Sequence, residues 1–396
     1  MIPAAPVAVT GVGCVCAAGQ NLTACLDSLF AGRGGPAPPT RFVCRQPQLL
    51  PVFEVPGAWI EPYAEPGLTA SATLLLRAAD EALHRAGWKP GARGRVGVVI
   101  GTSVGASLDF LDCYRRWRSG GEPDLAAIRR YARSNPALLL ARRLDLGGPA
   151  LTLTNACSSG TDAIGLGAAW VRQGLCDAVL AGGADALSEI SYNGFARLMV
   201  ASPEPCRPFD LHRAGLNLGE GAAVLVLEGN GKARRGQACG YVLGYGACGD
   251  AHHLTAPHPE ARGLRRALED CLVHSGMAAG EVGFINVHGT ATASNDAVEG
   301  RLLAEMLPGV PVSATKGFTG HTLGAAGAVE AAFVLGCLGR SELPPSLGFS
   351  QADPAVGTAP VAQRTGTDAR TAISLSLAFG GLNAALALGR GEVPCA

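Results

Sequence analysis

The 396-residue sequence lacks a surplus of charge of either sign. Lys+Arg and Asp+Glu number 32 each, and charged residues make up only 16% of the chain. A nucleic-acid binder that depends on bulk positive charge is therefore excluded. Aromatic residues are few, at 5%, but hydrophobic residues reach 48%, which excludes wholesale disorder and allows a large buried core. The length fits two domains or one large double unit.

The sequence also lacks the patterns of a secreted, metal-binding or membrane protein. Its thirteen cysteines are scattered, odd in number and without C-x-x-C spacing, so we expect reduced thiols, no disulfide framework and no metal site. The apolar start has no basic segment before it, which argues against a signal peptide. No uncharged apolar run is long and glycine-free enough to predict a membrane span. We expect a cytoplasmic protein.

Short apolar runs rich in β-branched residues alternate with Ala/Leu-rich helical stretches. Near-continuous apolar strands bounded by helices are typical of sheets buried on both faces, so the predicted class is α/β. The predicted strands are 7–10, 96–100, 150–154, 178–181, 222–227, 284–287, 310–314, 371–375 and 384–388, and the predicted helices are 71–86, 136–144, 160–172, 260–275, 297–306 and 324–338.

One supersecondary pattern occurs twice. The strand, polar turn and small-residue helix of "LTLTNACSSGTDAIGLGAAWV" return about 160 residues later as "VPVSATKGFTGHTLGAAGAVEAAFVLGCL". Both helices are Gly/Ala-rich on all sides, which suits helices packed between two sheets. We expect an N-terminal half, 1–232, and a C-terminal half, 233–396, joined within the polar segment 228–237.

The first residue that points to chemistry is Cys157, which follows an apolar strand and precedes Ser-Ser-Gly and a helix. Its sulfur is expected on a sharp turn at a helix N-terminus, where the dipole and the free N–H groups favour the thiolate. The same amides could bind a developing oxyanion. A buried cysteine is more often a structural residue than a nucleophile, and this chain has thirteen cysteines. Whether Cys157 is catalytic therefore depends on which residues could act with it.

Two histidines and a lysine in the second half are the expected partners. His288 ends an apolar strand and His321 precedes a helix, both at Gly/Thr turns where α/β sheets place their sites. A thiol with two imidazoles suits acyl transfer. Lys316 is one of three lysines beside 29 arginines, and a buried ammonium would need a carboxylate, for which Asp296 or Glu299 is the expected partner. Structural histidines and a surface lysine are the ordinary alternatives.

Five segments occur in the order "TNACSSGTDAIG", "RPFDLHRAGLNLGEGAAVLVLE", "VHGTATASNDAVE", "SATKGFTGHTLGAAGAVE" and "SLSLAFGGLNAAL". Together they resemble the β-ketoacyl-acyl-carrier-protein synthases, in the elongating branch, with the type II polyketide ketosynthases close by. The resemblance runs from residue 7 to about residue 388. It implies a thiolase fold, in which two similar βαβαβαββ halves form a five-layer αβαβα sandwich, and a dimer.

The resemblance also implies a function. The reaction would be the decarboxylative Claisen condensation of malonyl-carrier protein with an acyl chain held on a cysteine, in fatty acid or type II polyketide or polyene elongation. The partners would be an acyl carrier protein and a second subunit, either a copy of this chain or a chain-length-factor-like protein. No cofactor of its own is expected, because the carrier protein brings the phosphopantetheine.

By motif position, Cys157 would be the acyl-accepting nucleophile. His288 and His321 would be the pair that promotes decarboxylation, supported by Lys316 with Glu299 nearby. These roles are carried over from the family motifs and not from spacing alone.

Further positions are implied to bind substrate. The backbone N–H groups of Cys157 and Phe379 would form the oxyanion hole, and Phe379 also matches the aromatic gatekeeper at the mouth of the site. Thr290 and Thr292 match the threonines that hydrogen-bond the phosphopantetheine arm. Asp296 matches another acidic position of the same motif.

The sequence departs from the family at two positions. Leu377 stands where elongating synthases commonly have an aromatic beside the gate, and Phe110 falls near the floor of the acyl pocket, where smaller residues are usual. Arg129, Arg130 and Arg133 are the predicted docking patch for the acidic carrier protein, with a solvated helix face as an equal alternative.

Three other functions remain open at this stage. A degradative thiolase with coenzyme A substrates shares the fold, although thiolases typically have a second Cys in place of one His. A non-catalytic chain-length-factor-like subunit lacks the nucleophile, whereas Cys157 and both histidines are present here. An unrelated Cys hydrolase needs an orienting group and a water path, which nothing in the sequence selects.

Overall fold

The computed structural model describes residues 4–42, 44, 46–88, 94–105, 111–229 and 237–396. These residues build one large mixed sheet of ten strands, with the order β3-β2-β4-β5-β1-β6-β12-β11-β7-β8. The strands are β1 (Val7–Cys16), β2 (Val96–Gly101), β3 (Ala150–Leu153), β4 (Ala178–Asp185), β5 (Gly221–Glu228), β6 (Gly240–Gly249), β7 (Phe284–Asn286), β8 (Val312–Ser313), β11 (Thr371–Ala378) and β12 (Leu382–Arg390). A separate small ladder pairs β9 (Glu342–Leu343) with β10 (Thr365–Gly366).

The helices of the described part of the chain are α1 (Leu22–Phe30), α2 (Gly57–Ile60), α3 (Ala70–Arg85), α4 (Leu111–Arg118), α5 (Leu125–Arg133), α6 (Pro136–Arg143), α7 (Ser159–Arg172), α8 (Glu189–Arg197), α9 (Arg262–Ser275), α10 (Ala293–Met306), α11 (Lys316–Thr319) and α12 (Ala326–Arg340). Short 3-10 turns include η3 (Ala156–Ser158) and η5 (Leu323–Ala325). Every predicted strand and helix is present, with shifted ends. The sequence missed β6 and several helices, among them α1 and α8.

The sheet consists of two equivalent sets of five strands. In the first set β3, β2 and β4 are parallel, whereas β5 and β1 follow antiparallel. The second set, β8-β7-β11-β12-β6, repeats the same order and the same directions. The two sets meet where Val7–Val9 of β1 pairs with Gly240–Val242 of β6. This duplication confirms the predicted α/β class and its two similar halves. The predicted boundary at residue 232 lies outside the described residues, between β5 and β6.

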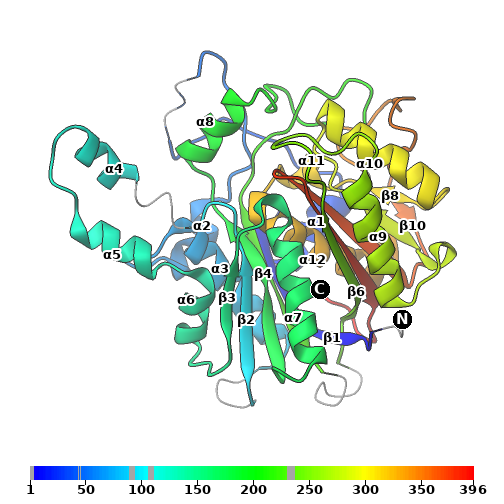
Figure 1. The fold of residues 1–396 in the computed structure, drawn as a ribbon, viewed down its shortest axis with the longest axis horizontal. Helices are drawn as coiled ribbons and strands as arrows, with labels where there is room; N and C mark the ends of the chain where they lie inside the picture. Colours follow the sequence, from blue (N-terminus) through cyan, green and yellow to red (C-terminus); the bar gives the residue numbers. More distant parts are fainter. Residues whose placement is uncertain (1–3, 43, 45, 89–93, 106–110, 230–236) are drawn as a thin grey trace.

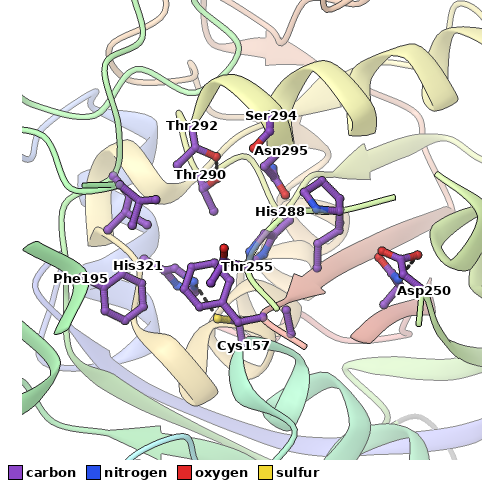
Figure 2. A pocket seen from close by; sticks show the side chains of 17 residues that line it. Cys157, Phe195, Asp250, Thr255, His288, Thr290, Thr292, Ser294, Asn295 and His321 are labelled. Carbon is purple, nitrogen blue, oxygen red and sulfur yellow. Dashed lines mark hydrogen bonds between the residues drawn. The ribbon is translucent and has the colours of Figure 1, made fainter. Parts of the chain in front are cut away.

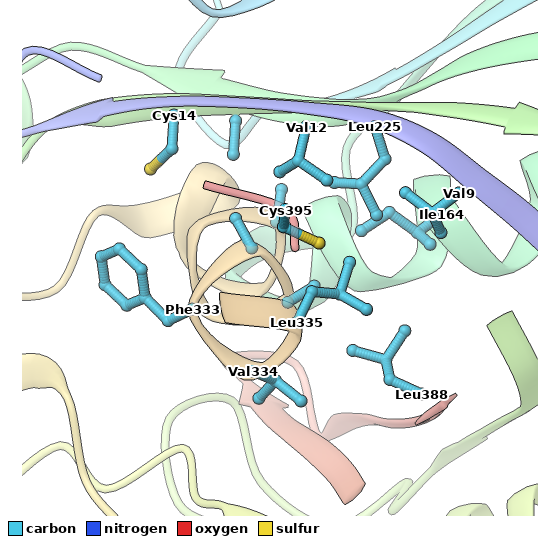
Figure 3. Packing of buried hydrophobic residues seen from close by; sticks show 14 of the residues in the cluster. Val9, Val12, Cys14, Ile164, Leu225, Phe333, Val334, Leu335, Leu388 and Cys395 are labelled. Atoms are coloured by element: carbon cyan, nitrogen blue, oxygen red, sulfur yellow. The ribbon is translucent and has the colours of Figure 1, made fainter. Parts of the chain in front are cut away.

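The helices α7 and α12 form the middle layer. They contact each other, and each also contacts strands of both sets: α7 packs on β4 and β6, and α12 on β5 and β12. Figure 3 shows Phe333, Val334 and Leu335 of α12 beneath β1. Every residue of α12 from Ala326 to Leu338 is buried, as expected for a helix packed on all sides; it lies between the two five-stranded sets of the single sheet.

The outer layers cover the other faces of the sheet. On the first set, α3 packs on β1, β4 and β5, and α6 packs on β2 and β3. On the second set, α9 packs on β6 and β12, and apolar residues of α10 join the same core cluster. The α4–α5 segment extends away from the body of the molecule (Figure 1).

One described helical segment, Leu323–Arg340, has the length and composition of a membrane span, and 89% of it is buried inside the protein. Its place between the two sets of strands accounts for its apolar character.

Candidate active site

The nucleophile candidate lies in a sharp turn between β3 and α7. Ala156 has a φ of 48°, in the left-handed region, and Cys157 follows it within η3. Side-chain hydrogen bonds hold this turn: Ser158 Oγ and Asn155 Nδ2 both donate to Asp162 Oδ2 at 2.8 Å. Tyr245 of β6 donates to the other oxygen of Asp162 at 2.8 Å. The second half of the chain therefore fixes the turn that presents the thiol.

The structure brings Cys157 and both histidines together (Figure 2). Nε2 of His321 lies 3.0 Å from Sγ of Cys157. The ring of His288 stands edge-on to that of His321, with centroids 5.1 Å apart and planes at 82°. All three side chains are buried. The first half supplies the thiol and the second half supplies the imidazoles.

Hydrogen bonds fix the main chain at both histidines. His321 N–H donates to the carbonyl of Asn217 at 2.8 Å, and Gly219 N–H donates to the carbonyl of His321 at 2.9 Å. His288 follows β7, and its N–H donates to Glu299 Oε1 at 2.6 Å. Gly289 N–H donates to Glu299 Oε2 at 2.9 Å. Glu299 therefore positions the backbone of His288 from α10.

Lys316 is buried, as its rarity suggested, but the predicted carboxylate partner is wrong. Its Nζ pairs with Glu330 of α12 at 2.5 Å and also donates to the carbonyl of His288. Glu299 is occupied by the amides described above, and Asp296 accepts the N–H of Phe209 at 2.7 Å. The sequence analysis missed Glu330, although a single carboxylate within the apolar helix α12 was a signal for a buried charge.

The protonation of the thiol also differs from the expectation. Burial raises the pKa of Cys157 to about 12, whereas the charge of Lys316 and the N–H of Phe379 act in the opposite direction. The expected preference for thiolate at the helix start is therefore wrong for the unliganded site. Burial and the positive charge of Lys316 hold the pKa values of His288 and His321 well below 6.5. The resting pair is a thiol beside a neutral imidazole.

Three buried carboxyl groups of the second half lie near the site: Glu299 at the backbone of His288, Glu330 at Lys316, and Asp296 on the same helix as Glu299. Burial raises the pKa of Glu299 to about 8, of Glu330 to about 7 and of Asp296 to about 6. The charge of Lys316 partly opposes this effect at Glu330, and backbone N–H donors oppose it at the other two. Desolvation is thus the dominant influence on the pKa values of these three carboxyl groups, as it is for the thiol and both imidazoles.

Phe379, the residue predicted as the gate, lines the cavity beside Cys157 and packs against a second aromatic ring. The ring of Phe379 stacks on Phe195 of α8, with centroids 5.6 Å apart and planes at 17°, and Phe195 stands edge-on to His321 at 6.4 Å. The cavity beside Cys157 has about 60 Å³ of free space, far below the 300–1,000 Å³ typical of ligand pockets. Both stacked rings therefore lie in the wall of this small cavity. Phe195 had no distinguishing signal in the sequence.

Most other predicted substrate positions line the same cavity. Thr290, Thr292, Leu377 and Phe379 all face it, and the two threonine hydroxyls lie 2.9 Å apart. Figure 2 shows both threonines on the side of the cavity away from Cys157. Asp296 is absent from the lining and lies fully buried behind it.

The remaining predictions fall elsewhere. Arg129 is exposed on α5 and does not line the cavity, and the side chains of Arg130 and Arg133 on the same helix lie outside the described part of the structure. Phe110 also lies outside the described residues, so its place in the acyl pocket stays a prediction.

Comparison with known proteins identifies the family. The N-terminal domain model of β-ketoacyl synthase matches residues 4–233, and the C-terminal domain model matches residues 239–350. The chain belongs to the β-ketoacyl synthase family. The ordered motifs of the sequence and the duplicated fold are thus accounted for together.

Relatives of this synthase include fatty acid and polyketide enzymes. It is 34% identical to the 3-oxoacyl-[acyl-carrier-protein] synthase 2 of Rhizobium meliloti over 84% of this chain and 83% of the relative. It is 31% identical to the tetracenomycin polyketide synthase ketoacyl synthase alpha subunit of Streptomyces glaucescens over 97% of both chains.

Solved structures show the same relationship. The ishigamide ketosynthase/chain length factor superposes with a TM-score of 0.90 at 31% identity, over 98% of this chain and 99% of the other. A ketosynthase of Xenorhabdus doucetiae, solved in complex with its chain length factor, gives a TM-score of 0.82 at 32% identity, over 97% and 98% of the two chains. The thiolase fold expected from the sequence is confirmed.

Proposed function

We propose that this ketosynthase is an elongating β-ketoacyl-acyl-carrier-protein synthase that condenses malonyl-carrier protein with an acyl chain held on Cys157. The observation that carries the proposal is the 3.0 Å contact between Sγ of Cys157 and Nε2 of His321, with His288 and the Lys316 ammonium directly behind it. The names of the relatives place the substrates in fatty acid or polyketide synthesis.

In the first half-reaction, Cys157 takes the acyl group from the carrier thioester. As Sγ attacks the carbonyl carbon, His321 Nε2 accepts the thiol proton, because the thiol is protonated and the imidazole neutral at rest. The N–H of Phe379 interacts with Cys157, and with the N–H of Cys157 it holds the tetrahedral oxyanion. The bond to the carrier sulfur then breaks, and the carrier thiol leaves with the proton.

In the second half-reaction, malonyl-carrier protein enters and loses carbon dioxide. Nζ of Lys316 lies 3.3 Å from Nδ1 of His288, and an ammonium only donates, so Nδ1 accepts and the ring hydrogen is on Nε2. His288 thereby donates a hydrogen bond from Nε2 to the malonyl thioester oxygen. Neutral His321 does the same in the tautomer that carries its hydrogen on Nε2, and both hydrogen bonds stabilise the enolate. The enolate carbon attacks the acyl carbonyl on Cys157, a C–C bond forms and the C–S bond to Cys157 breaks. Cys157 leaves as a thiolate and takes up one proton from solvent.

This mechanism also determines which cofactor and partners the enzyme needs. The thiol, the imidazoles, the amides and one proton from solvent account for every proton and charge in the two steps. The proposed enzyme therefore uses no cofactor of its own, and phosphopantetheine arrives on the carrier. Thr290 and Thr292 are placed to bind the amide groups of that arm. The docking arginines, defined as Arg129, Arg130 and Arg133, attract the acidic carrier. We place the enzyme in the cytoplasm, as a dimer with a second copy or with a chain-length-factor-like subunit.

Intact-protein mass spectrometry tests the proposal. The enzyme is incubated with acyl-carrier protein, with the same acyl group on coenzyme A, and with no thioester, and Cys157→Ser serves as the matched control. The proposal expects one acyl adduct per chain, formed faster from the carrier thioester and absent in the variant. If the folded protein forms no adduct, the proposal is wrong and the chain is a non-catalytic subunit. If an adduct forms only from the coenzyme A thioester, the chain is a thiolase instead.

A further inference from the structure

Three of the thirteen cysteines lie together, far along the chain from the nucleophile. Cys14 and Cys16 are two residues apart on β1 and point to the same face, and Cys25 reaches them from α1. All three side chains are fully buried. Figure 3 shows Cys14 projecting from β1 into the core, on the side of α12. The catalytic steps proposed above use none of these thiols.

The geometry of the three thiols fits a shared ligand. Their sulfur atoms all lie within 4.8 Å of one another, and those of Cys16 and Cys25 are 3.6 Å apart. Sulfur ligands at roughly 2.3 Å from one metal ion are themselves roughly 3.8–4.0 Å apart. The cluster therefore needs a contraction of less than about 1 Å to bind an ion at its centre. The spacing C-x-C-x8-C differs from the C-x-x-C pattern of common metal sites. For this reason the sequence predicted no metal site.

The surroundings limit the site to three ligands. Glu81 is the nearest carboxylate to this turn, and its oxygens accept the N–H groups of Cys14 and Leu22 at 3.0 Å and pair with Arg85 at 3.1 Å. It is therefore not available as a fourth ligand. Structural zinc sites are almost always four-coordinate, whereas thiolate ligands in a three-coordinate arrangement suit Cu(I).

We propose that Cys14, Cys16 and Cys25 form a three-sulfur binding site for a thiophilic monovalent cation, Cu(I). The site is sealed, so the ion enters while β1 and α1 are still open, during folding or local unfolding. Once bound, it ties the end of β1 to α1.

Metal analysis of the purified protein tests this site. The chain is produced in copper- and zinc-supplemented medium and purified anaerobically, and both metals are counted per chain by mass spectrometry. We expect about one copper per folded chain, and less than about a tenth of that in Cys16→Ser and Cys25→Ser. Cys271→Ser is the matched control, because Cys271 is equally buried but lies in a different core cluster; it should keep its copper.

Chelation of the wild-type protein keeps the test independent of how the variants fold. A Cu(I)-specific chelator should remove copper only after unfolding in urea. Copper that is lost from the native protein, copper retained in the Cys16 and Cys25 variants, zinc in place of copper, or a Cys16–Cys25 disulfide would each overturn the proposal. Acylation of Cys157 is measured in parallel, so that a failure of the metal site is distinguished from a failure of the condensing function.

Discussion

The contact between His321 and Cys157 leads to a prediction about which histidine the acylation step needs. Of the two histidines in the described structure, His321 is the one whose hydrogen bond to Sγ is seen, whereas His288 faces His321 and Lys316. His321→Ala should therefore slow acylation of Cys157 by about 10²–10⁴-fold, the usual contribution of a general base. His288→Ala should change acylation only a few-fold, although it should lose decarboxylation.

The prediction can also be tested through the pH dependence of the acylation rate. With a pKa of about 12, about one thiol in ten thousand is ionised at pH 8. Without a base, acylation depends on that fraction, so the rate in His321→Ala should rise about tenfold per pH unit from about pH 7 to about pH 10. The wild-type rate should be flat over the same range, because the lowered pKa of His321 keeps the imidazole neutral there.

The assay is single-turnover transfer from acyl-carrier protein, followed by quenched-flow intact mass. The matched control is His288→Ala, which removes an equally buried imidazole from the same site. Near-wild-type acylation in His321→Ala, with a plateau below about pH 8, would refute the reasoning. Such a result would mean that the N-terminus of α7 lowers the pKa of the thiol enough to form the thiolate without His321 as a base, as the sequence predicted.

Three further predictions concern other parts of the enzyme. Cys157→Ala should abolish acylation and condensation but still release carbon dioxide from malonyl-carrier protein, and equal loss of both activities would contradict the division between thiol and imidazoles. The free energy of unfolding should fall by about 2–3 kcal/mol from about pH 6.5 to 8.5, because the raised pKa values of Glu299 and Glu330 favour the folded state at low pH and this advantage is lost as pH rises through about 7 and about 8. In denaturant titrations Glu299→Gln should flatten that slope, and an unchanged slope would assign it to other groups. Charge reversal of the docking arginines should raise KM for carrier-bound substrates in a salt-dependent way and leave small thioester mimics nearly unaffected; equal effects on both substrates would exclude a docking role.

The sequence predicted the elements whose hydrophobic pattern is decisive and missed those that depend on close packing. The strand β6 reads GYVLGYGACG, and its glycines hide the strand pattern. In the structure a Cβ at Gly246 would lie 2.1 Å from the carbonyl oxygen of Ala267, and one at Gly244 would lie 2.6 Å from that of Cys271. The glycines are there because α9 packs directly on the backbone of β6. Only the folded contact reveals this requirement.

The candidate site shows the same limit. Motifs predicted Cys157, His288 and His321, because each side chain follows a strand or precedes a helix in a recognisable turn. The carboxylate partner predicted for Lys316 was wrong. Glu330 is 14 residues away in the sequence and reaches Lys316 only because α12 packs into the middle layer. The stacking of Phe195 on Phe379 is likewise a contact between distant segments.

Each half of the molecule holds the catalytic group of the other half. Tyr245 of the second half fixes the turn of Cys157 through Asp162, and the carbonyl of Asn217 in the first half fixes His321. Gly324, at the start of the middle-layer helix segment, donates its N–H to the buried carboxylate of Asp185 in β4 at 2.7 Å. Because anchors and reactive groups cross the interface in both directions, the 3.0 Å separation of thiol and imidazole depends on how the two halves dock. The duplicated fold thus serves catalysis directly, since neither half contains both a nucleophile and its base.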